Sequence, residues 1–357
     1  MILDFSFLKK RNILIYDGVS LTILKHIIFK EKFNVYFNRW EKLNFWVLVL
    51  TLLKFNYRNI SEIKKHYKKN FISLCAPKVI ITFIDNNPSF YELKSIYPEA
   101  ITISIQNGVR KSNDLRMFNK KKKYYCDYFL VFSKYHKKFF SKVIKSKYIN
   151  SGSIKMNEYK KRAFKKKGEV LFISQTATHA SELEKVEKFL IKNLIKICTD
   201  LKIRFNILCK KNVKKKIVGE FSEIKLSNIF ESDASFLPYE IIQKFELKVF
   251  VDSTLGLESL AIGEKALAIP LGCMSKHKKK FDIKKKIEKF GFPLKLADKG
   301  YCWSNDFEYP ALKKKIFKLI KLKQGDWKKI HKKNLLMNYD EGNKKLKKIL
   351  KDNRIYI

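Results

Sequence analysis

Short runs of β-branched and other apolar residues recur between residues 12 and 270, and most of them are followed by a longer mixed segment. This alternation is typical of βαβ units, in which buried parallel strands are joined by helices, and it disfavours a β-sandwich or a helix bundle. The expected fold class is therefore α/β with parallel sheets. The runs predict strands at 12–16, 34–37, 78–84, 100–105, 128–132, 148–150, 169–174, 204–209, near 229, 249–252 and 265–270.

The chain of 357 residues is long enough for two domains of ordinary size. A polar, lysine-rich stretch at 155–168 lacks any periodic apolar signal and interrupts the strand-forming runs. The tail instead carries apolar residues at helical spacing among many lysines. We therefore expect a first domain at 1–154, a second at 155–308 and C-terminal helices at 309–357.

The chain is strongly basic, with 77 Lys and Arg residues against 34 Asp and Glu residues and a formal net charge of +43. Lys far outnumbers Arg, although Arg is the residue that favours bidentate binding of phosphates and bases. Part of the lysine excess is what an AT-rich genome would encode on a tolerant surface. The rest favours an anionic membrane leaflet or anionic small substrates as partners. Nucleic acid ranks third and is not the expected partner, because the chain carries no nucleic-acid-binding motif.

Six cysteines form no CxxC pair and have no histidine at metal-ligand spacing, so they predict reduced core residues rather than a zinc site. The first residues lack the basic and apolar regions of a secretory signal, which predicts a cytoplasmic location. The most apolar window, at 45–53, is too short to span a bilayer. We expect it to form a core helix, with an interfacial membrane anchor as the alternative.

The stretch at 249–270 predicts a strand, a tight polar turn, a short helix, a glycine stop and a second strand. The turn Asp252-Ser253-Thr254 ends the first strand and begins the helix. Its free backbone N–H groups and two hydroxyls would therefore face the crevice outside the sheet, where a phosphate group is stabilised. The alternative is that Ser253 serves only as a helix N-cap.

Three more residues of this stretch are placed by helical spacing. Glu258 lies one turn after Thr254 on the same helix face, where its carboxylate would accept hydrogen bonds from a ribose diol beyond the phosphates. The alternative is a solvated helix acid. Gly256 would leave the backbone open to a bulky ligand, and Gly263 is placed to end the helix.

This stretch resembles the nucleotide-binding βαβ unit of the GT-B glycosyltransferases and of the related UDP-N-acetylglucosamine 2-epimerase. The similarity is closest to the bacterial surface-carbohydrate group, which includes Kdo transferases, sialyltransferases and CDP-glycerol glycerophosphotransferases. Residues 148–157 are similar to the interdomain hinge of this group, 169–177 to the first strand of its donor domain and 237–247 to the helix before its phosphate turn. The resemblance covers roughly residues 148–272.

The resemblance implies two Rossmann-like domains that face each other across a cleft, with the donor in the C-terminal one. Many members carry His-Pro after the second donor-domain strand, where this chain has Lys210 and Lys211, which would bind an anionic group by charge or form a solvated loop. The chain also lacks the Gly-Gly and paired glutamates of the epimerase turn, so epimerase ranks below transferase. The donor-binding residues implied are Ser174, Gln175, Thr176, Lys210, Ser253, Thr254, Leu255, Gly256 and Glu258.

On the acceptor side, an inverting transfer needs a general base near the acceptor hydroxyl and stabilisation of the leaving phosphate. Asp17 and Asp85 each end a predicted strand, and His179 follows the first strand of the donor domain, so these three are the catalytic candidates. Ordinary turn chemistry and a structural histidine are the alternatives. The loop at 106–110 provides an acceptor or anion site made of Asn107, Gly108 and Arg110.

The chain contains no nucleophile elbow, P-loop, HExxH or GxGxxG motif, which disfavours hydrolases, kinases, zinc proteases and dehydrogenases. The expected function is a glycosyltransferase, without metal or cofactor, that moves a sugar from a nucleotide-sugar donor to a surface polysaccharide or lipopolysaccharide. Its expected partners are the donor, a glycan or lipid-linked acceptor and the anionic inner face of the cell membrane. The alternatives are a nucleotide-sugar epimerase and a non-catalytic, membrane-associated binding protein with a decayed site.

Overall fold

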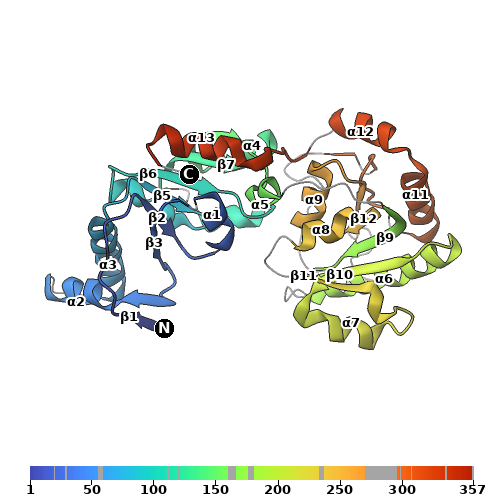
Figure 1. Ribbon diagram of the computed structural model, residues 1–357, viewed down its shortest axis with the longest axis horizontal. Helices are drawn as coiled ribbons and strands as arrows, with labels where there is room; N and C mark the ends of the chain where they lie inside the picture. The colour runs from blue at the N-terminus through green and yellow to red at the C-terminus, as the bar shows by residue number, and fades with distance from the viewer. Residues whose placement is uncertain are drawn as a thin grey trace. The chain divides into compact units, whose positions relative to one another are not determined.

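The chain folds as two compact units (Figure 1). The first contains Met1–Glu158 and Asp340–Ile357, and the second contains Tyr159–Tyr339. The first boundary is close to the predicted one, whereas the predicted separate helical segment at 309–357 is divided between the two units. The computed structural model describes all residues except 20, 29, 55–58, 111, 120, 160–165, 176–180, 233–236, 270–295, 298, 307, 334–335 and 356–357.

A parallel six-stranded sheet forms the centre of the first unit, in the order β3-β2-β5-β6-β7-β8. The order changes direction between β2 and β5, and such a switch point leaves a crevice outside the carboxyl ends of the two strands. Both strands are buried along their whole length, as expected of the middle of a parallel sheet. The strands are β2 (Ile13–Tyr16), β3 (Phe33–Tyr36), β5 (Val79–Thr82), β6 (Ile101–Ile105), β7 (Tyr124–Val131) and β8 (Ile144–Asn150).

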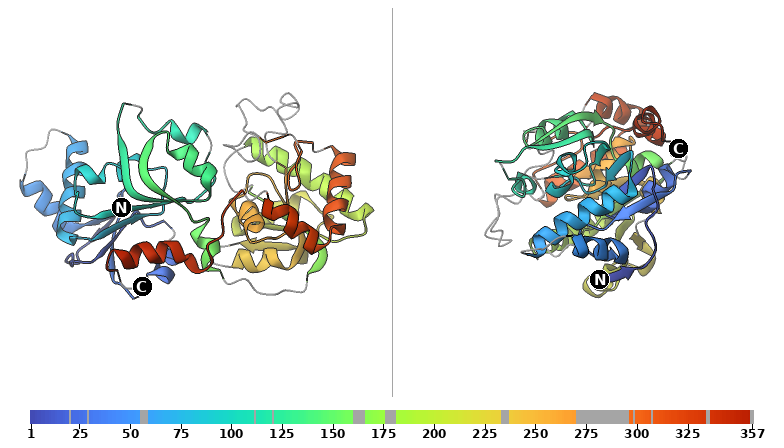
Figure 2. Two further views of the ribbon diagram at one scale, coloured as in Figure 1. Left: turned by 90° about the horizontal axis from the view of Figure 1, so that it is seen from above. Right: turned by 90° about the vertical axis from the view of Figure 1, so that its left-hand side faces the viewer.

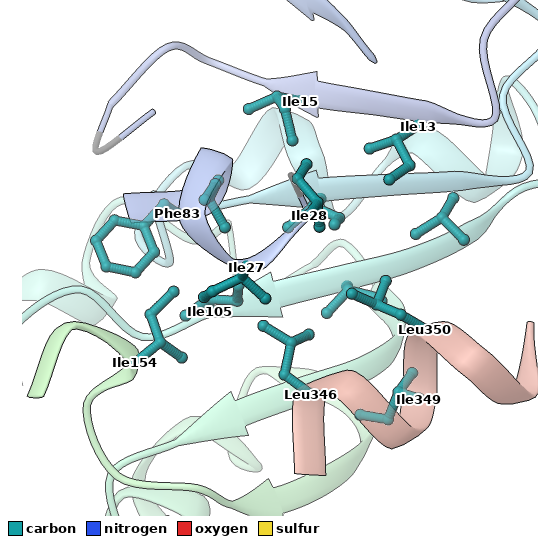
Figure 3. Packing of buried hydrophobic residues seen from close by; sticks show 14 of the residues in the cluster. Ile13, Ile15, Ile27, Ile28, Phe83, Ile105, Ile154, Leu346, Ile349 and Leu350 are labelled. Carbon is teal, nitrogen blue, oxygen red and sulfur yellow. The ribbon is translucent and has the colours of Figure 1, made fainter. Parts of the chain in front are cut away.

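The core of the first unit is completed by a helix from the far end of the chain. Leu346 and Leu350 of α13 belong to the same hydrophobic cluster as Ile13 and Ile105 of the sheet (Figure 3). α13 lies along this unit, although the whole second unit separates it in sequence from the other helices (Figure 2). The helices of the first unit are α1 (Leu21–Ile27), α2 (Phe45–Lys54), α3 (Ile60–Cys75), α4 (Lys134–Phe140), α5 (Ile154–Glu158) and α13 (Lys344–Asp352).

Buried side-chain amides form hydrogen bonds between the segment where the chain leaves the first unit and the segment where it returns. Asn157 Nδ2 donates to the backbone oxygen of Ser151 at 2.8 Å and to Asn343 Oδ1 at 3.1 Å. The backbone N–H of Asp340 donates to Asn157 Oδ1 at 2.9 Å. The point where the chain leaves this unit is therefore hydrogen-bonded to the point where it returns.

A small parallel sheet joins β1 (Ile2–Asp4) to β4 (Lys42–Asn44). The sequence does not predict it, because strands of three residues are too short to show a periodic pattern. β4 leads directly into α2, which packs against α3 at one end of the unit (Figure 1).

The helix predicted at 45–53 exists as α2, but it is not a core helix. Val47 and Thr51 are buried, whereas Trp46, Leu52 and Leu53 are exposed. The expectation of a buried position is therefore wrong for the outer face of α2. In the part of the chain that the structure describes, no helix is both long and apolar enough to cross a membrane.

The second unit has a parallel five-stranded sheet in the order β11-β10-β9-β12-β13, which changes direction between β9 and β12. Both sheets thus confirm the predicted pair of Rossmann-like domains. The strands are β9 (Lys167–Ile173), β10 (Phe205–Lys210), β11 (Ile229–Ser232), β12 (Phe245–Phe250) and β13 (Ala266–Ala268). The helices include α6 (Ser181–Asp200), α7 (Lys214–Glu220), α8 (Leu237–Gln243), α9 (Thr254–Ala261), α11 (Tyr309–Lys321) and α12 (Gln324–Lys333).

Every strand predicted from an apolar run is present. The largest differences are at the starts of β7, β8 and β12, which begin earlier than predicted. In β8 and β12 the first residues alternate with polar ones, and in β7 Asp127 interrupts the apolar run. The prediction of reduced, buried cysteines is confirmed for Cys75, Cys126, Cys198, Cys209 and Cys302, and Cys273 lies outside the described residues.

Charged side chains are buried where β12 pairs with the first residue of β13. Lys248 Nζ and Lys166 Nζ both donate to Glu264 Oε2, at 2.7 and 2.6 Å. Burial lowers the pKa of Lys248 to about 8, and the attraction of Glu264 opposes that shift. The buried carboxylate of Glu264 therefore compensates the buried ammonium of Lys248 and the half-buried ammonium of Lys166.

Candidate functional site

The carboxyl ends of β9 and β12 lie side by side at the switch point of the second sheet. Ile173 pairs with Phe250 in register, so the residues that follow each strand share one edge of the sheet. Ser174 follows β9, and the turn before α9 follows β12. This is the edge at which sheets of this kind bind ligands.

The helix predicted to follow β12 begins at Thr254, with Ser253 as its N-cap. Ser253 has extended backbone angles and is 3% exposed. Within the described residues, its side chain makes no capping hydrogen bond, so the alternative that Ser253 serves only as a helix N-cap is not supported. The N–H groups of the first turn have no acceptor within the helix, as at any helix N-terminus. The start of α9 therefore brings together free amides, the buried hydroxyl of Ser253 and the half-buried hydroxyl of Thr254.

Glu258 is buried rather than solvated, at 4% exposure. The hydroxyl of Tyr239, on α8, donates to Glu258 Oε2 at 3.0 Å. Tyr239 in turn stacks on Tyr159, with ring centroids 5.5 Å apart. The alternative of a solvated helix acid is therefore wrong, because a second helix holds this carboxylate in a fixed orientation.

Gly256 has a packing role that the sequence does not reveal. A Cβ atom at this position would lie 2.2 Å from Cγ of Phe250. The glycine thus allows α9 to approach the last residue of β12, and the interpretation that it leaves space for a ligand is wrong. Gly263 does end the helix as predicted, with a φ of +83°.

A buried carboxylate from α6 holds the end of β9. Glu187 is fully buried and accepts from Ser174 Oγ at 2.7 Å and from the backbone N–H of Gln175 at 2.8 Å. The hydroxyl hydrogen of Ser174 is thereby directed to Glu187 rather than to a ligand. The sequence signal for Glu187 was available, since this acid stands beside Val186 and one turn before Leu190, both on the apolar face of α6.

The remaining predicted donor residues are less constrained. Lys210 is exposed at the end of β10, and Leu255 is half-buried in the first turn of α9. Thr176 and His179 lie outside the described residues.

In the first unit, Asp85 follows β5 at the switch point and is fully buried. Arg110 Nε donates to Asp85 Oδ2 at 2.8 Å, and Arg110 Nη2 donates to Oδ1. The backbone N–H of Asn107 also donates to Oδ1, at 3.3 Å. Both oxygens of Asp85 are thus used to hold the predicted 106–110 loop, an arrangement that suits a positioning residue better than a proton acceptor.

The loop itself is braced from a second side. Gln106 Nε2 donates to the backbone oxygen of Gly108 at 2.9 Å, and Gln106 Oε1 accepts from the N–H of Phe132 at 2.9 Å. Asn107, Gly108 and Arg110 are half-buried. The structure therefore places the three predicted residues on one loop that is held by hydrogen bonds with Asp85 and Gln106.

Asp17 follows β2 and is separated from Asp85 by one strand pairing, since Tyr16 pairs with Thr82. Its φ of +73° lies in the left-handed region, which Asp tolerates better than most residues. Arg39 Nη2 contacts Asp17 Oδ1 at 3.3 Å. The two predicted carboxylates therefore stand at the carboxyl ends of neighbouring strands.

A polar cluster that the sequence does not indicate lies at the same strand end. The hydroxyl of Tyr16 donates to Asn38 Oδ1 at 2.7 Å and lies 2.6 Å from Ser89 Oγ. The ammonium of Lys68, on α3, is 5.8 Å from the centre of the Tyr16 ring, and burial lowers the pKa of Lys68. These groups come from four separate segments, so no local motif could have predicted them.

His136, on α4, is buried beneath the end of β7. Its Nδ1 is 3.1 Å from Ser133 Oγ, and no described residue lies within hydrogen-bond distance of its Nε2. Burial lowers the pKa of His136 to about 4. This imidazole is therefore neutral at physiological pH.

Metal ligands do not gather among the described residues, where no three His, Cys, Asp or Glu side chains form a group that could hold an ion.

A family model described as "putative O-antigen biosynthesis protein" matches residues 103–185 and 179–354, more than half of the chain. No curated protein matches it. Among solved structures, the wall teichoic acid polymerase TagF is similar with 12% identity and a TM-score of 0.55, over 97% of this chain and 90% of that one. A protein described as a putative UDP-N-acetylglucosamine 2-epimerase from Listeria monocytogenes has 10% identity and a TM-score of 0.55, over 97% of both chains.

The UDP-GlcNAc 2-epimerase from Neisseria meningitidis, bound to UDP-GlcNAc, is also similar, with 11% identity and a TM-score of 0.51 over 95% of this chain and 99% of that one. At such low identities the likeness concerns the fold alone. It agrees with the two Rossmann-like domains that the strand orders show.

Proposed function

The chain belongs to the O-antigen biosynthesis family whose model matches it, and on that premise we propose that it is a glycosyltransferase. It moves a sugar from a nucleotide-sugar donor to a growing surface glycan, without a bound metal. The observation that carries this proposal is the turn at Ser253 and Thr254, which presents helix amides and hydroxyls at the switch point of the second sheet.

The second unit is the donor-binding unit in this proposal. The amides at the start of α9 and the hydroxyls of Ser253 and Thr254 stabilise the donor phosphates. Glu258, oriented by Tyr239, accepts a hydrogen bond from the ribose. The exposed ammonium of Lys210 adds positive charge near the phosphates. Ser174 and Glu187 act indirectly, because they hold the end of β9 in place.

The first unit supplies the acceptor side. Arg110 carries a guanidinium on a braced loop, and Asp85 fixes its orientation. Asp17 is the better placed general base of the two aspartates, since Arg39 contacts its Oδ1 whereas Arg110 uses both oxygens of Asp85. His179 remains a further catalytic candidate.

Calorimetric titration of the full chain with CMP, UDP, CDP and GDP tests the donor site. We expect one nucleotide to bind, and Glu258→Gln to weaken it by about tenfold or more, because a hydrogen bond to a charged acceptor is lost. Glu223→Gln is the matched control, an exposed acid of the same unit that should leave the affinity unchanged. Unchanged affinity in Glu258→Gln would refute the ribose role.

Absence of binding by all four nucleotides would overturn the donor site as a whole and favour a non-catalytic binding protein. An epimerase on the same fold is the second enzymatic candidate, since two of the similar structures carry that name. Incubation of the nucleotide sugar with the enzyme but without acceptor distinguishes them. An epimerase would convert the sugar, whereas the proposed transferase would leave it unchanged.

A further inference from the structure

The first unit carries a group of large apolar side chains on its surface. Leu53 is 80% exposed and Phe7 is 73% exposed, and the others are also open to solvent. Single exposed apolar residues are ordinary, but several on one short helix and on the segment packed against it mark an interaction surface. We call it the N-terminal apolar patch, and its members are Phe5, Phe7, Trp46, Leu52 and Leu53.

The aromatic part of the patch is a built structure. The ring of Phe7 stacks on Trp46 with centroids 5.0 Å apart, and Phe5 contacts Phe45 at 4.9 Å. Trp46 Nε1 donates to the backbone oxygen of Phe5 at 2.8 Å. Pairing of β1 with β4 fixes the segment that carries these rings. The rings are therefore held together at the surface.

α2 turns the polar Thr51 inward and several apolar side chains outward. Thr51 is buried, where its hydroxyl donates to the backbone oxygen of Val47 at 2.7 Å and accepts from Asn70 Nδ2, on α3, at 3.0 Å. Trp46 and Leu53 are seven positions apart and share the opposite, exposed face. A helix on the surface of a water-soluble protein usually turns polar residues to the solvent and apolar residues to the core. The outer face of α2 is therefore suited to an apolar environment.

The part of the chain that carries the patch is basic. Residues 1–75 include fourteen Lys and Arg residues and five Asp and Glu residues. Lys9 and Lys10 follow Phe7 in sequence, and Lys64 and Lys65 lie on α3, and all four are exposed. A patch of this composition is complementary to a surface that combines apolar and anionic groups.

A cavity of about 690 Å³ adjoins the patch and shares Phe7 with it. Lys9, Arg11, Lys32 and Lys42 line the cavity, together with the acids Asp4 and Glu31. Four cations against two carboxylates give it a positive balance, which suits an anionic head group next to the apolar contact.

We propose that the N-terminal apolar patch is seated in the interface of an anionic lipid bilayer. Phe7 and Trp46 lie at the level of the head groups, the leucines at the end of α2 reach the acyl boundary, and the lysines near the patch contact lipid phosphates. With ten residues, α2 lies in the interface and does not span it. This inference goes beyond the proposed function and does not depend on it.

The lysines near the patch favour a bilayer over a second copy of the chain as its partner. A symmetric dimer would bring the same surface of two subunits together, so the lysines near one patch would face those near the other. Like charges in such a contact are unfavourable. An anionic bilayer satisfies both the apolar and the basic part of the surface.

Co-sedimentation of the full chain with vesicles tests the proposal. We expect binding to vesicles of phosphatidylcholine mixed with phosphatidylglycerol, weak binding to phosphatidylcholine alone, and loss of binding as NaCl is raised to about 0.5 M. The double variant Leu52→Ser/Leu53→Ser should lower the partition coefficient by about tenfold or more, because two exposed leucines no longer enter the interface.

The matched control is Leu226→Ser/Phe317→Ser, which removes two exposed apolar residues of the second unit and should bind as the wild type does. Circular dichroism of both double variants verifies that they fold. Quenching of tryptophan fluorescence by brominated phosphatidylcholine gives a second readout, and Trp46→Phe should remove the quenched component.

Three results would overturn the proposal. The first is wild-type binding that does not depend on phosphatidylglycerol or is absent altogether. The second is equal binding by the wild type and Leu52→Ser/Leu53→Ser. The third is a dimer in light scattering that this variant dissociates while vesicle binding is absent, which would assign the patch to a second copy.

Discussion

Replacing His136 with Gln should make the free energy of unfolding of the first unit less dependent on pH between pH 8 and pH 4. The pKa of His136 is about 4 in the folded protein, against an ordinary value of 6.5. Between these values the unfolded chain binds a proton that the folded protein does not, so stability falls as the pH is lowered. The loss amounts to about 2 kcal/mol at pH 5 and about 3 kcal/mol at pH 4, relative to pH 8.

Urea unfolding of wild type and His136→Gln at pH 8, 6 and 5 measures this effect, with hydrogen exchange in peptides of β7 identifying the transition of the first unit. His26→Gln, on the exposed side of α1, controls for the loss of an imidazole. A direct check is an NMR titration in which the resonance missing from His136→Gln stays constant from pH 8 to pH 5. Titration of that resonance near pH 6.5 would contradict the assigned burial.

Three changes to the core should also be measurable by urea unfolding. Gly256→Ala should destabilise the second unit by about 1–3 kcal/mol through its clash with Phe250, and adding Phe250→Leu should restore part of the loss; an unchanged midpoint would contradict the clash. Glu264→Gln should cost about 3 kcal/mol or more, because Lys248 is left buried without a counter-charge, whereas a cost below about 1 kcal/mol would show that the charge is not needed. Leu350→Ala should cost about 2–5 kcal/mol in the first unit and leave the second unchanged; equal effects on both would contradict the division into units.

Buried strands were the most predictable part of the fold, because each is a run of apolar residues that ends in a polar loop. Ile13–Tyr16 and Val79–Thr82 are examples in which every residue is buried. The small sheet of β1 and β4 could not be predicted, since its strands are short and pair across forty residues of sequence. Such long-range pairing leaves no local pattern.

The orientation of α2 shows a second limit. Apart from Thr51 and the terminal Lys54, its sequence is apolar on all sides, so composition alone indicates a buried helix. The structure instead turns Thr51 toward Asn70 and leaves Trp46 and Leu53 exposed. The inner face of α2 thus combines the apolar Val47 with the polar Thr51, whereas a surface helix usually turns apolar residues inward and polar ones outward.

For the candidate site, the sequence located the helix start at Ser253 and the braced loop at Arg110, because both depend on a motif of a few neighbouring residues. The partners of those residues were not predictable. Glu258 is held by Tyr239 and Asp85 by Arg110, and each pair is formed by residues that are distant in sequence. Prediction therefore named Glu258, Asp85 and Arg110, but it missed Tyr239 and the pairing of Asp85 with Arg110.

The position of α13 has a consequence for the order in which the chain folds. Leu346 and Leu350 complete the first core, so that core cannot close on a ribosome until they have emerged. The second unit is continuous in sequence and can form earlier. Once it has folded, its two ends are close enough for Asp340 to reach Asn157, which shortens the loop that α13 must close. We therefore expect the second unit to fold before the first unit is complete, and its folding to help α13 reach the core of the first unit.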